Sequence, residues 1–132
     1  MIFVDTSFWV ALAIEADREH DHAVELFATH ARAALTTSNL VCGETWTFVG
    51  RRFGHPRAVA VIETLEQTRR LQIVRIEAET ERDAWEWLKR RDEREYSYVD
   101  ATSFALMRRL AIREALAFDD DFAAAGFVLL RA

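Results

Sequence analysis

One cysteine, one proline and one lysine occur among the 132 residues of this chain. The lone cysteine, Cys42, excludes an internal disulfide and a cage of thiolates around a metal ion. With one proline and four glycines, the chain has no linker or low-complexity tract that would separate two domains. We therefore expect a single domain over residues 1–132, which is long enough to bury a core without disulfides or metal.

Long apolar runs are missing as well. A membrane span needs roughly 18 consecutive apolar residues, and Asp5, Glu15 and Asp17 interrupt the N-terminal apolar stretch. No basic residue precedes that stretch and Asp5 falls inside it, which is unlike a signal peptide. The expectation is a cytoplasmic protein with no membrane contact.

Positive charge is scarce and is carried almost wholly by arginine. The chain has 17 basic and 22 acidic residues and a net charge of −5, so it is not a polybasic nucleic-acid binder. All basic residues except Lys89 are Arg, whose planar guanidinium matches phosphate or carboxylate oxygens in pairs. Hydrophobic residues make up 51% and charged residues 30% of the chain, which excludes a disordered protein.

Apolar periodicity alternates between strands and helices along the chain. Short strands are expected at 1–4, 34–37, 71–76, 115–118 and 127–130. Helices are expected at 7–14, 19–33, 39–53, 56–69, 79–94, 97–111 and 120–125. Strands separated by helices predict an α/β fold, a three-layer α/β/α sandwich with a mainly parallel central sheet.

Acidic side chains fall where such a sheet binds ligands, at the carboxyl ends of its strands. Asp5 follows the first strand, and Asp119 follows the predicted strand 115–118. Each has an ordinary alternative, because Asp is common in turns and Asp119 can cap a short helix that begins at Asp120.

Two further carboxylates stand on apolar helix faces. Glu44 lies between Leu40 and Phe48 on the helical wheel, and a carboxylate in an apolar stripe is rarely buried unless it is paired or binds a metal. Either a partner arginine or a bound cation would account for it. Asp100 heads the core-facing stripe of its helix, where it completes a capping box opened by Ser97, points toward the other acids, or does both.

Carboxylates that converge repel one another unless a cation offsets their charge. Oxygen donors without His or Cys indicate Mg²⁺ or Mn²⁺ rather than Zn²⁺. The four histidines show no metal-binding spacing, and no glycine-rich phosphate loop is present. Metal sites of this kind serve phosphate chemistry, in which the metal activates water and stabilises the attacking and leaving oxygens.

The acids lie within an ordered set of four motifs: Phe3-Val4-Asp5-Thr6-Ser7, Thr37-Ser38 through Glu44-Thr45-Trp46, Ser97-Tyr98-Val99-Asp100-Ala101, and Phe118-Asp119-Asp120-Asp121-Phe122 followed by Gly126-Phe127. In this order and at these intervals the set resembles the PIN-domain ribonucleases. The resemblance covers nearly the whole chain, and the length suits the VapC-type toxins of VapBC toxin–antitoxin pairs.

The resemblance implies a Mg²⁺- or Mn²⁺-dependent endoribonuclease that cuts RNA by water attack and leaves 5′-phosphate and 3′-hydroxyl ends. The acidic positions of the family are matched by four residues, Asp5, Glu44, Asp100 and Asp119. The first three would hold one metal, and Asp119 or Asp121 would complete a second, weaker site.

Hydroxyl groups near the acids both match and depart from the family pattern. Thr6 or Ser7 matches the hydroxyl beside the first acid, which would orient that carboxylate. Ala117 stands where many relatives carry a threonine two residues before the fourth acid. Ser7 or Ser103 is the candidate substitute for that missing hydroxyl.

Contacts to RNA are predicted outside the acids. The arginines expected to attract the flanking phosphates are Arg51, Arg52 and Arg91. The candidates for stacking on unpaired bases are the tryptophans Trp9, Trp46, Trp85 and Trp87. Against this, Trp85 and Trp87 share a wide arc of their helix with Ala84 and Leu88, which is typical of a core face.

The resemblance also implies an antitoxin protein as partner and a homodimer. Two alternatives stay open: a PIN nuclease of RNA processing without a toxin role, and a catalytically silent module of the same fold, favoured only by Ala117. A phosphatase of the haloacid dehalogenase type requires D-x-D-x-T, and position 7 is Ser7. A receiver domain requires a lysine at a later strand end, whereas Lys89 lies within a predicted helix.

Overall fold

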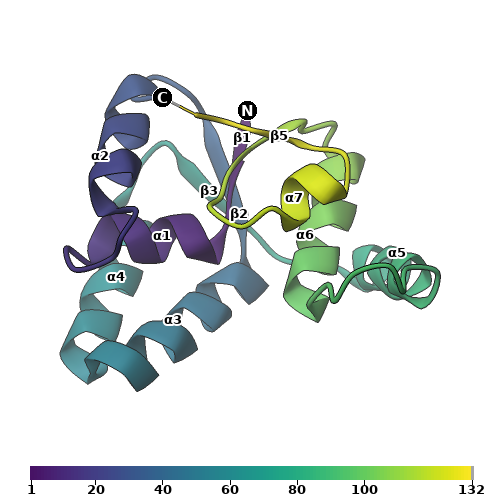
Figure 1. Cartoon of the computed structure of the whole chain (residues 1–132), viewed down its shortest axis with the longest axis horizontal. Coiled ribbons are helices and arrows are strands. Elements are labelled where there is room, and N and C mark those ends of the chain that lie inside the picture. The colour runs from purple at the N-terminus through teal and green to yellow at the C-terminus, as the bar shows by residue number, and fades with distance from the viewer. Residues whose placement is uncertain (132) are drawn as a thin grey trace.

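The computed structural model describes residues 1–131, in which strands alternate with helices (Figure 1). The strands of this part of the chain are β1 (Ile2–Val4), β2 (Leu35–Ser38), β3 (Leu71–Val74), β4 (Glu114–Leu116) and β5 (Val128–Leu129). Its helices are α1 (Thr6–Ala13), α2 (His20–Thr29), α3 (Asn39–Phe53), α4 (His55–Gln67), α5 (Ala78–Lys89), α6 (Tyr98–Arg109) and α7 (Asp121–Ala124). Each predicted element is present, with ends that shift by a few residues.

The five strands form one sheet in the order β3-β2-β1-β4-β5, and every neighbouring pair is parallel. Strand β1 lies in the middle and all of its residues are buried, as its unbroken apolar sequence predicts. The strand order reverses at β1, because β2 and β3 lie on one side of it and β4 and β5 on the other. Ligands of such sheets bind at the carboxyl ends of the strands beside this reversal.

Helices cover the sheet on both sides. Figure 1 shows α1 to α4 at the left of the strands and α5 to α7 at the right. The predicted α/β fold, a three-layer α/β/α sandwich, is therefore confirmed, with a wholly parallel sheet. Among residues 1–131, none of the helices combines the length and the apolar character that a membrane crossing requires.

Aromatic packing fixes the segments that carry the later acids. The ring of Phe104, one turn after Asp100 in α6, lies 4.9 Å from that of Phe122 in α7. The Phe122 ring lies 6.1 Å from that of Phe3 in β1, and the three rings are fully buried. Burying one such side chain contributes about 1.5–3 kcal/mol. The core therefore holds α6 and α7 against the central strand.

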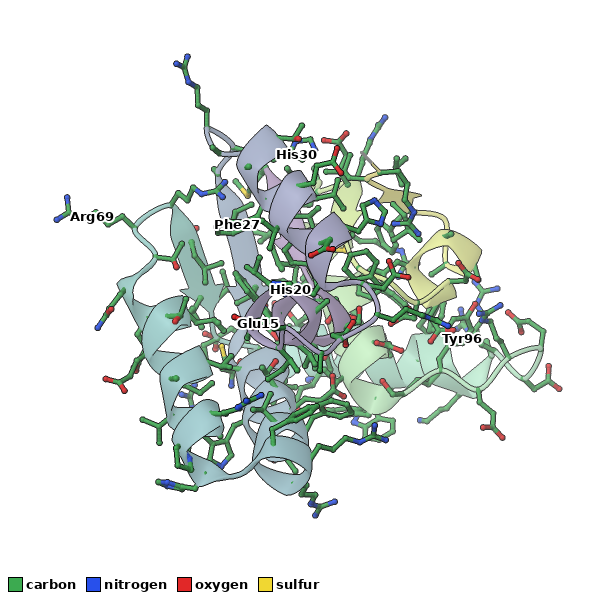
Figure 2. All side chains as sticks on the ribbon, turned by 60° about the vertical axis from the view of Figure 1, so that its left-hand side comes forward. Glu15, His20, Phe27, His30, Arg69 and Tyr96 are labelled. Atoms are coloured by element: carbon green, nitrogen blue, oxygen red, sulfur yellow. The ribbon has the colours of Figure 1, made fainter. Side chains whose placement is uncertain are left out.

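Side-chain hydrogen bonds explain two elements that end earlier than predicted. Helix α2 stops at Thr29 because the guanidinium of Arg70 caps its C-terminal end. The guanidinium donates hydrogen bonds to the carbonyl oxygens of His30 and Phe27, two residues labelled in Figure 2. Strand β3 stops at Val74 because the backbone N–H of Ile76 donates to Asn39 Oδ1 at 2.8 Å instead of continuing the sheet.

The remaining boundary shifts follow from helix termination. Helix α5 ends at Lys89 rather than at residue 94, since the next two N–H groups bond to carbonyl oxygens only three residues back. The predicted break between α3 and α4 is confirmed. It occurs at Gly54, whose φ of 96° lies in the region that favours glycine, and Pro56 follows in the first turn of α4.

Candidate metal centre

Three carboxylates converge at the carboxyl edge of the sheet. Asp5, Asp100 and Asp119 each offer an oxygen, and these oxygens all lie within 4.8 Å of one another. Asp5 follows β1, Asp100 stands in the first turn of α6, and Asp119 lies in the loop between β4 and α7. The strand reversal thus brings together side chains that are more than a hundred residues apart in the sequence. We call these three residues the acid cluster.

Asp5 is held through one of its two oxygens. Its Oδ2 accepts hydrogen bonds from the backbone N–H of Ser7 at 3.2 Å and from the Ser7 hydroxyl at 2.7 Å. The same hydroxyl accepts a bond from the backbone N–H of Phe118 at 3.0 Å, which ties the end of β1 to the end of β4. The other oxygen, Oδ1, is buried and has no hydrogen-bond partner among the described residues. An unpaired buried carboxylate oxygen is costly unless a cation meets it.

Asp100 combines the two roles that its sequence position allows. Ser97 caps α6, and its Oγ accepts from the backbone N–H of Asp100 at 2.9 Å. The reciprocal half of a capping box is missing, since within residues 1–131 the Asp100 carboxylate accepts no hydrogen bond from Ser97 or another residue. The backbone therefore completes the cap, and the carboxylate is left to face the other acids.

Asp119 belongs to the acid cluster and Asp121 does not. Asp119 Oδ1 accepts from the backbone N–H of Asp121 at 3.0 Å, which sets the turn into α7. The Asp121 carboxylate instead binds Arg94 Nε at 2.7 Å, on the loop between α5 and α6. Of the two alternatives for the fourth acid, Asp119 is the one whose side chain faces Asp5 and Asp100.

Burial and mutual repulsion make the acid cluster hard to ionise. The pKa of Asp5 is raised from 3.8 to about 7, first by burial and then by the charge of Asp119. The pKa of Asp100 is raised from 3.8 to about 8, first by burial and then by the charges of Asp5 and Asp119. Burial also raises the pKa of Asp119. A hard cation among these oxygens would offset the charge that the protein leaves uncompensated.

Glu44 lies beside the acid cluster, but the prediction of a buried stripe around it was wrong. The buried positions of α3 are Val41, Thr45 and Val49, each one residue further along the helix. The stripe that contains Glu44 and Phe48 is therefore rotated by about 100° away from the core. No arginine lies within ion-pair distance of Glu44 in the part of the chain that the structure describes.

A cavity of about 560 Å³ opens above the acid cluster. Glu44 lines it, and its charge contributes to the raised pKa of both Asp5 and Asp100. Sequence reasoning missed the part of the lining that comes from the α1–α2 loop, namely Asp17, Arg18 and Glu19. No periodic pattern marks a loop, so only the path of the chain reveals that these residues reach the site. Within the described lining, Arg18 is the one basic residue.

Of the candidate hydroxyl groups, that of Ser7 bonds to the acid cluster. Thr6 lines the same cavity, but its hydroxyl donates to the carbonyl oxygen of Val41 at 3.5 Å, toward α3. The Ser103 hydroxyl donates to the carbonyl oxygen of Val99 at 3.0 Å. Ala117 is buried and has no hydroxyl to offer. Among the candidates, Ser7 is thus the residue whose hydroxyl bonds to a carboxylate of the acid cluster.

The predicted RNA contacts are separated by the structure. Arg51 and Arg52 line a second hollow that borders the cavity of the acid cluster. Arg91 lies elsewhere, with its guanidinium 5.2 Å from the ring centre of Trp87, and it lines neither of these two hollows.

Two predictions about tryptophan were wrong. Trp9 is 1% exposed in the core, so it cannot stack on a base. Trp85 is 49% exposed, so it is not part of a core face, and its ring stacks on Tyr98 at 4.6 Å. Trp46 is also exposed.

The PIN domain family model matches residues 2–128 of the chain. The chain belongs to the PIN domain family. The order of its motifs predicted this family. The PIN fold thereby accounts for the parallel sheet and for the acids at its carboxyl edge.

Relatives of known name support this assignment. The chain is 54% identical, over 99% of its length and 98% of theirs, to the 23S rRNA-specific endonuclease VapC20 of two Mycobacterium tuberculosis strains, CDC 1551 / Oshkosh and ATCC 25618 / H37Rv. A crystal structure of Mycobacterium tuberculosis VapC20, described as a sarcin-ricin loop cleaving toxin, matches with a TM-score of 0.94 and 51% identity over the whole of both chains. FitAcB from Neisseria gonorrhoeae matches with a TM-score of 0.71 and 16% identity over 99% of this chain and 97% of that one, which is a likeness of fold.

Proposed function

We propose that this PIN-domain protein is the toxin of a toxin–antitoxin pair and a divalent-metal-dependent endoribonuclease that cuts the sarcin–ricin loop of 23S rRNA. The observation that carries the proposal is the acid cluster, in which buried carboxylates meet without a compensating cation from the described protein. The substrate is proposed from the 54% identity to a 23S rRNA-specific endonuclease and from the fold shared with a sarcin-ricin loop cleaving toxin.

The donor set fits Mg²⁺ or Mn²⁺. Asp5, Asp100 and Asp119 would hold the ion, since they are hard oxygen donors that converge and Asp5 has a buried oxygen without a hydrogen-bond partner among the described residues. A bound divalent cation would polarise the scissile phosphate and lower the pKa of a water molecule. Glu44 lines the cavity as a further carboxylate, and Asp121 enters the site only if its bond to Arg94 opens.

Other side chains of the protein would orient the carboxylates and attract the RNA backbone. Ser7 keeps Asp5 Oδ2 occupied by hydrogen bonds and so fixes the orientation of the carboxylate, whose Oδ1 has no partner among the described residues. Because the lining is strongly acidic, an RNA backbone needs positive charge nearby. Arg18 lines the cavity, and Arg51 and Arg52 line the adjoining hollow. No histidine is needed as a general base in this arrangement.

The partners and the place of action follow from the same proposal. The name of the relatives implies an antitoxin that binds the toxin, and we propose such a partner, a homodimer and action on RNA in the cytoplasm. A PIN nuclease of RNA processing is the alternative. Expression of this chain alone should arrest growth, and co-expression of a small protein encoded just upstream should restore it. Undisturbed growth on expression of active protein would favour RNA processing.

Cleavage of a synthetic sarcin–ricin hairpin tests the activity itself. The purified chain should cut the hairpin at one position in Mg²⁺ or Mn²⁺, leave 5′-phosphate and 3′-hydroxyl ends, and spare a hairpin with a scrambled loop. The matched inactive control is Asp5→Asn, which keeps the shape of the side chain. Equal cleavage of both hairpins would overturn the proposed substrate but not the nuclease.

A further inference from the structure

Two hollows meet on helix α3. The cavity of the acid cluster and a second hollow of about 730 Å³ share two lining residues, Glu44 and Phe48. Beyond them the second hollow is lined by Arg51 and Arg52 of α3 and by Val99 of α6. The acidic site and the arginine-bearing part of α3 are therefore one continuous surface, with the ring of Phe48 at the junction.

The ring of Phe48 is partly exposed at this junction, and the guanidinium of Arg52 lies over one of its faces. Phe48 follows Glu44 by one helical turn, and Arg52 follows Phe48 by another, so the three side chains lie on one face at intervals of about 6 Å. Phe48 is 36% exposed, and the guanidinium of Arg52 lies 4.9 Å from the centre of its ring. Along this face the order is a carboxylate beside the metal centre, a flat apolar ring and then a cation.

Gly43 supplies an independent observation on the same surface. It lines the second hollow, and, apart from its chain neighbours and the nearby backbone of its own helix, a Cβ added to it would meet no described atom within 4 Å. A glycine inside a helix costs about 1 kcal/mol relative to alanine, and no packing in the protein requires this one. A glycine in such a place keeps the helix surface open to the close approach of a ligand.

We propose that Phe48 is the stacking platform for the nucleobase next to the scissile phosphate, and that the RNA strand continues from the acid cluster along α3 to Arg51 and Arg52. This rests on the proposed function. A nucleic-acid strand alternates phosphates with flat bases. On this face a cation held by the acid cluster would bind one phosphate, the ring of Phe48 would bind a base, and the guanidinium of Arg52 would bind the next phosphate. The base lies on the exposed ring, and Arg52 and Arg51 contact the following phosphate.

Binding of RNA by a set of variants tests the platform. All proteins carry Asp5→Asn to prevent cleavage, and the probe is a fluorescent sarcin–ricin hairpin. Phe48→Ala should weaken binding about 5- to 100-fold, the range for loss of one base–aromatic stack, whereas Phe48→Trp should bind within about threefold of the parent. Phe53→Ala is the matched control, because Phe53 lies on the same helix, is also 36% exposed and lines neither hollow. It should bind as the parent does.

Hairpins that carry one abasic nucleotide, placed in turn on each side of the cleaved bond, identify the base. One abasic position should weaken RNA binding by the parent as much as Phe48→Ala does. Combining that abasic hairpin with Phe48→Ala should reduce the affinity no further than either change alone. Gly43→Leu, which fills the hollow, should reduce RNA affinity while raising the melting temperature.

The outcomes separate this proposal from the proposed function. Binding that is unchanged in Phe48→Ala, or abasic effects that add to it, would overturn the platform even if the chain without Asp5→Asn cuts the hairpin. Failure of that active chain to cut the hairpin, with binding that depends on Phe48, would overturn the proposed substrate alone. Dissociation of a dimer by Phe48→Ala, with unchanged RNA affinity per chain, would assign the ring to an interface between copies and overturn the platform.

Discussion

Between α5 and α6, two acids share one arginine, whereas at the ends of β1 and β4 the acid cluster has no cation among the described residues. Arg109 Nε lies 2.7 Å from Asp83 Oδ2, and Arg109 Nη1 lies 3.4 Å from Glu79 Oε2, at the surface. The acid cluster is buried or half-buried, and none of the described arginines forms an ion pair with it. Arginine is plentiful in this chain, so its absence from the cluster is a feature of the site.

The difference separates surface acids that have an arginine partner from buried acids that have none among the described residues. Exposed ion pairs contribute little to stability, because water already solvates both charges. Buried carboxylates without partners destabilise the metal-free protein, and their raised pKa values are typical of functional sites. The PIN fold keeps these acids together through its sheet topology and its aromatic core rather than through ion pairs.

Substitution at the acid cluster should have the largest effect. Asp5→Asn removes the charge that holds the cation and should lower RNA cleavage by more than about a hundredfold, the upper end of what loss of a mere supporting group costs. Circular dichroism should show an unchanged fold, because Asn can keep the cap of α1. Single-turnover cleavage in Mg²⁺ measures the loss. Activity within about twofold of the parent would remove Asp5 from the site.

The pH dependence of stability should reveal the uncompensated charge. Unfolded aspartates titrate near 3.8, whereas in the folded protein the pKa is about 7 for Asp5 and about 8 for Asp100. Between these values the folded state binds more protons than the unfolded state, so stability falls as pH rises from about 4 to 8. In EDTA the free energy of unfolding should drop by a few kcal/mol over this range.

Divalent metal provides the control for this titration. Mn²⁺ binds the folded state and should restore stability at pH 8 far more than at pH 5, where protons compete for the same oxygens. Urea unfolding at pH 5 and at pH 8, with and without Mn²⁺, measures the four free energies of unfolding that this comparison needs. Stability in EDTA that rises through this range would contradict the account.

Loss of the Ser7 hydroxyl should have a smaller effect. Ser7→Ala removes the group that joins Asp5 Oδ2 to the backbone N–H of Phe118. Cleavage or metal affinity should fall about 10- to 100-fold, as for other residues that orient a ligand. Ser103→Ala is the matched control, because its buried hydroxyl bonds, among the described residues, to the carbonyl oxygen of Val99 alone. Equal losses in the two variants would mean that Ser7 acts through stability alone.

The smallest effect is expected at the surface cluster. Arg109→Ala leaves Glu79 and Asp83 without their partner, yet all three side chains are well exposed. The melting temperature should change by no more than about 2 °C, and RNA cleavage should be unchanged. Differential scanning fluorimetry beside the cleavage assay measures both. A fall in melting temperature as large as that of a core variant would mean that these surface ion pairs contribute strongly to stability, contrary to this comparison.

Much of the fold follows from the sequence because short apolar runs alternate with amphipathic segments. Asp5 and Asp119 were recognised as candidates since each follows a buried strand, and parallel strands end at one edge. Asp100 was recognised from its place at the head of a stripe that includes Phe104. The sequence does not show which hydroxyl orients Asp5. The structure shows that it is Ser7 rather than Thr6, because the turn after β1 sets the direction of both side chains.

The misjudged residues show where sequence patterns stop. A helical wheel gives the relative directions of Glu44 and Phe48 but not the rotation of α3 against the sheet. It therefore indicates the stripe that lies beside the true core face of the helix. Trp9 and Trp85 differ in burial for the same reason. Arg18 reaches the cavity on a loop, whose path is set by packing that no local pattern encodes.

The central claim is that the acid cluster holds a divalent cation. Anomalous diffraction from crystals soaked in millimolar Mn²⁺ at pH 8 tests it most directly. We expect a single strong peak within about 2.5 Å of oxygens from Asp5, Asp100 and Asp119, and no such peak in Asp5→Asn crystals treated alike. A metal peak held by other residues, or an empty acid cluster at saturating Mn²⁺, would contradict it.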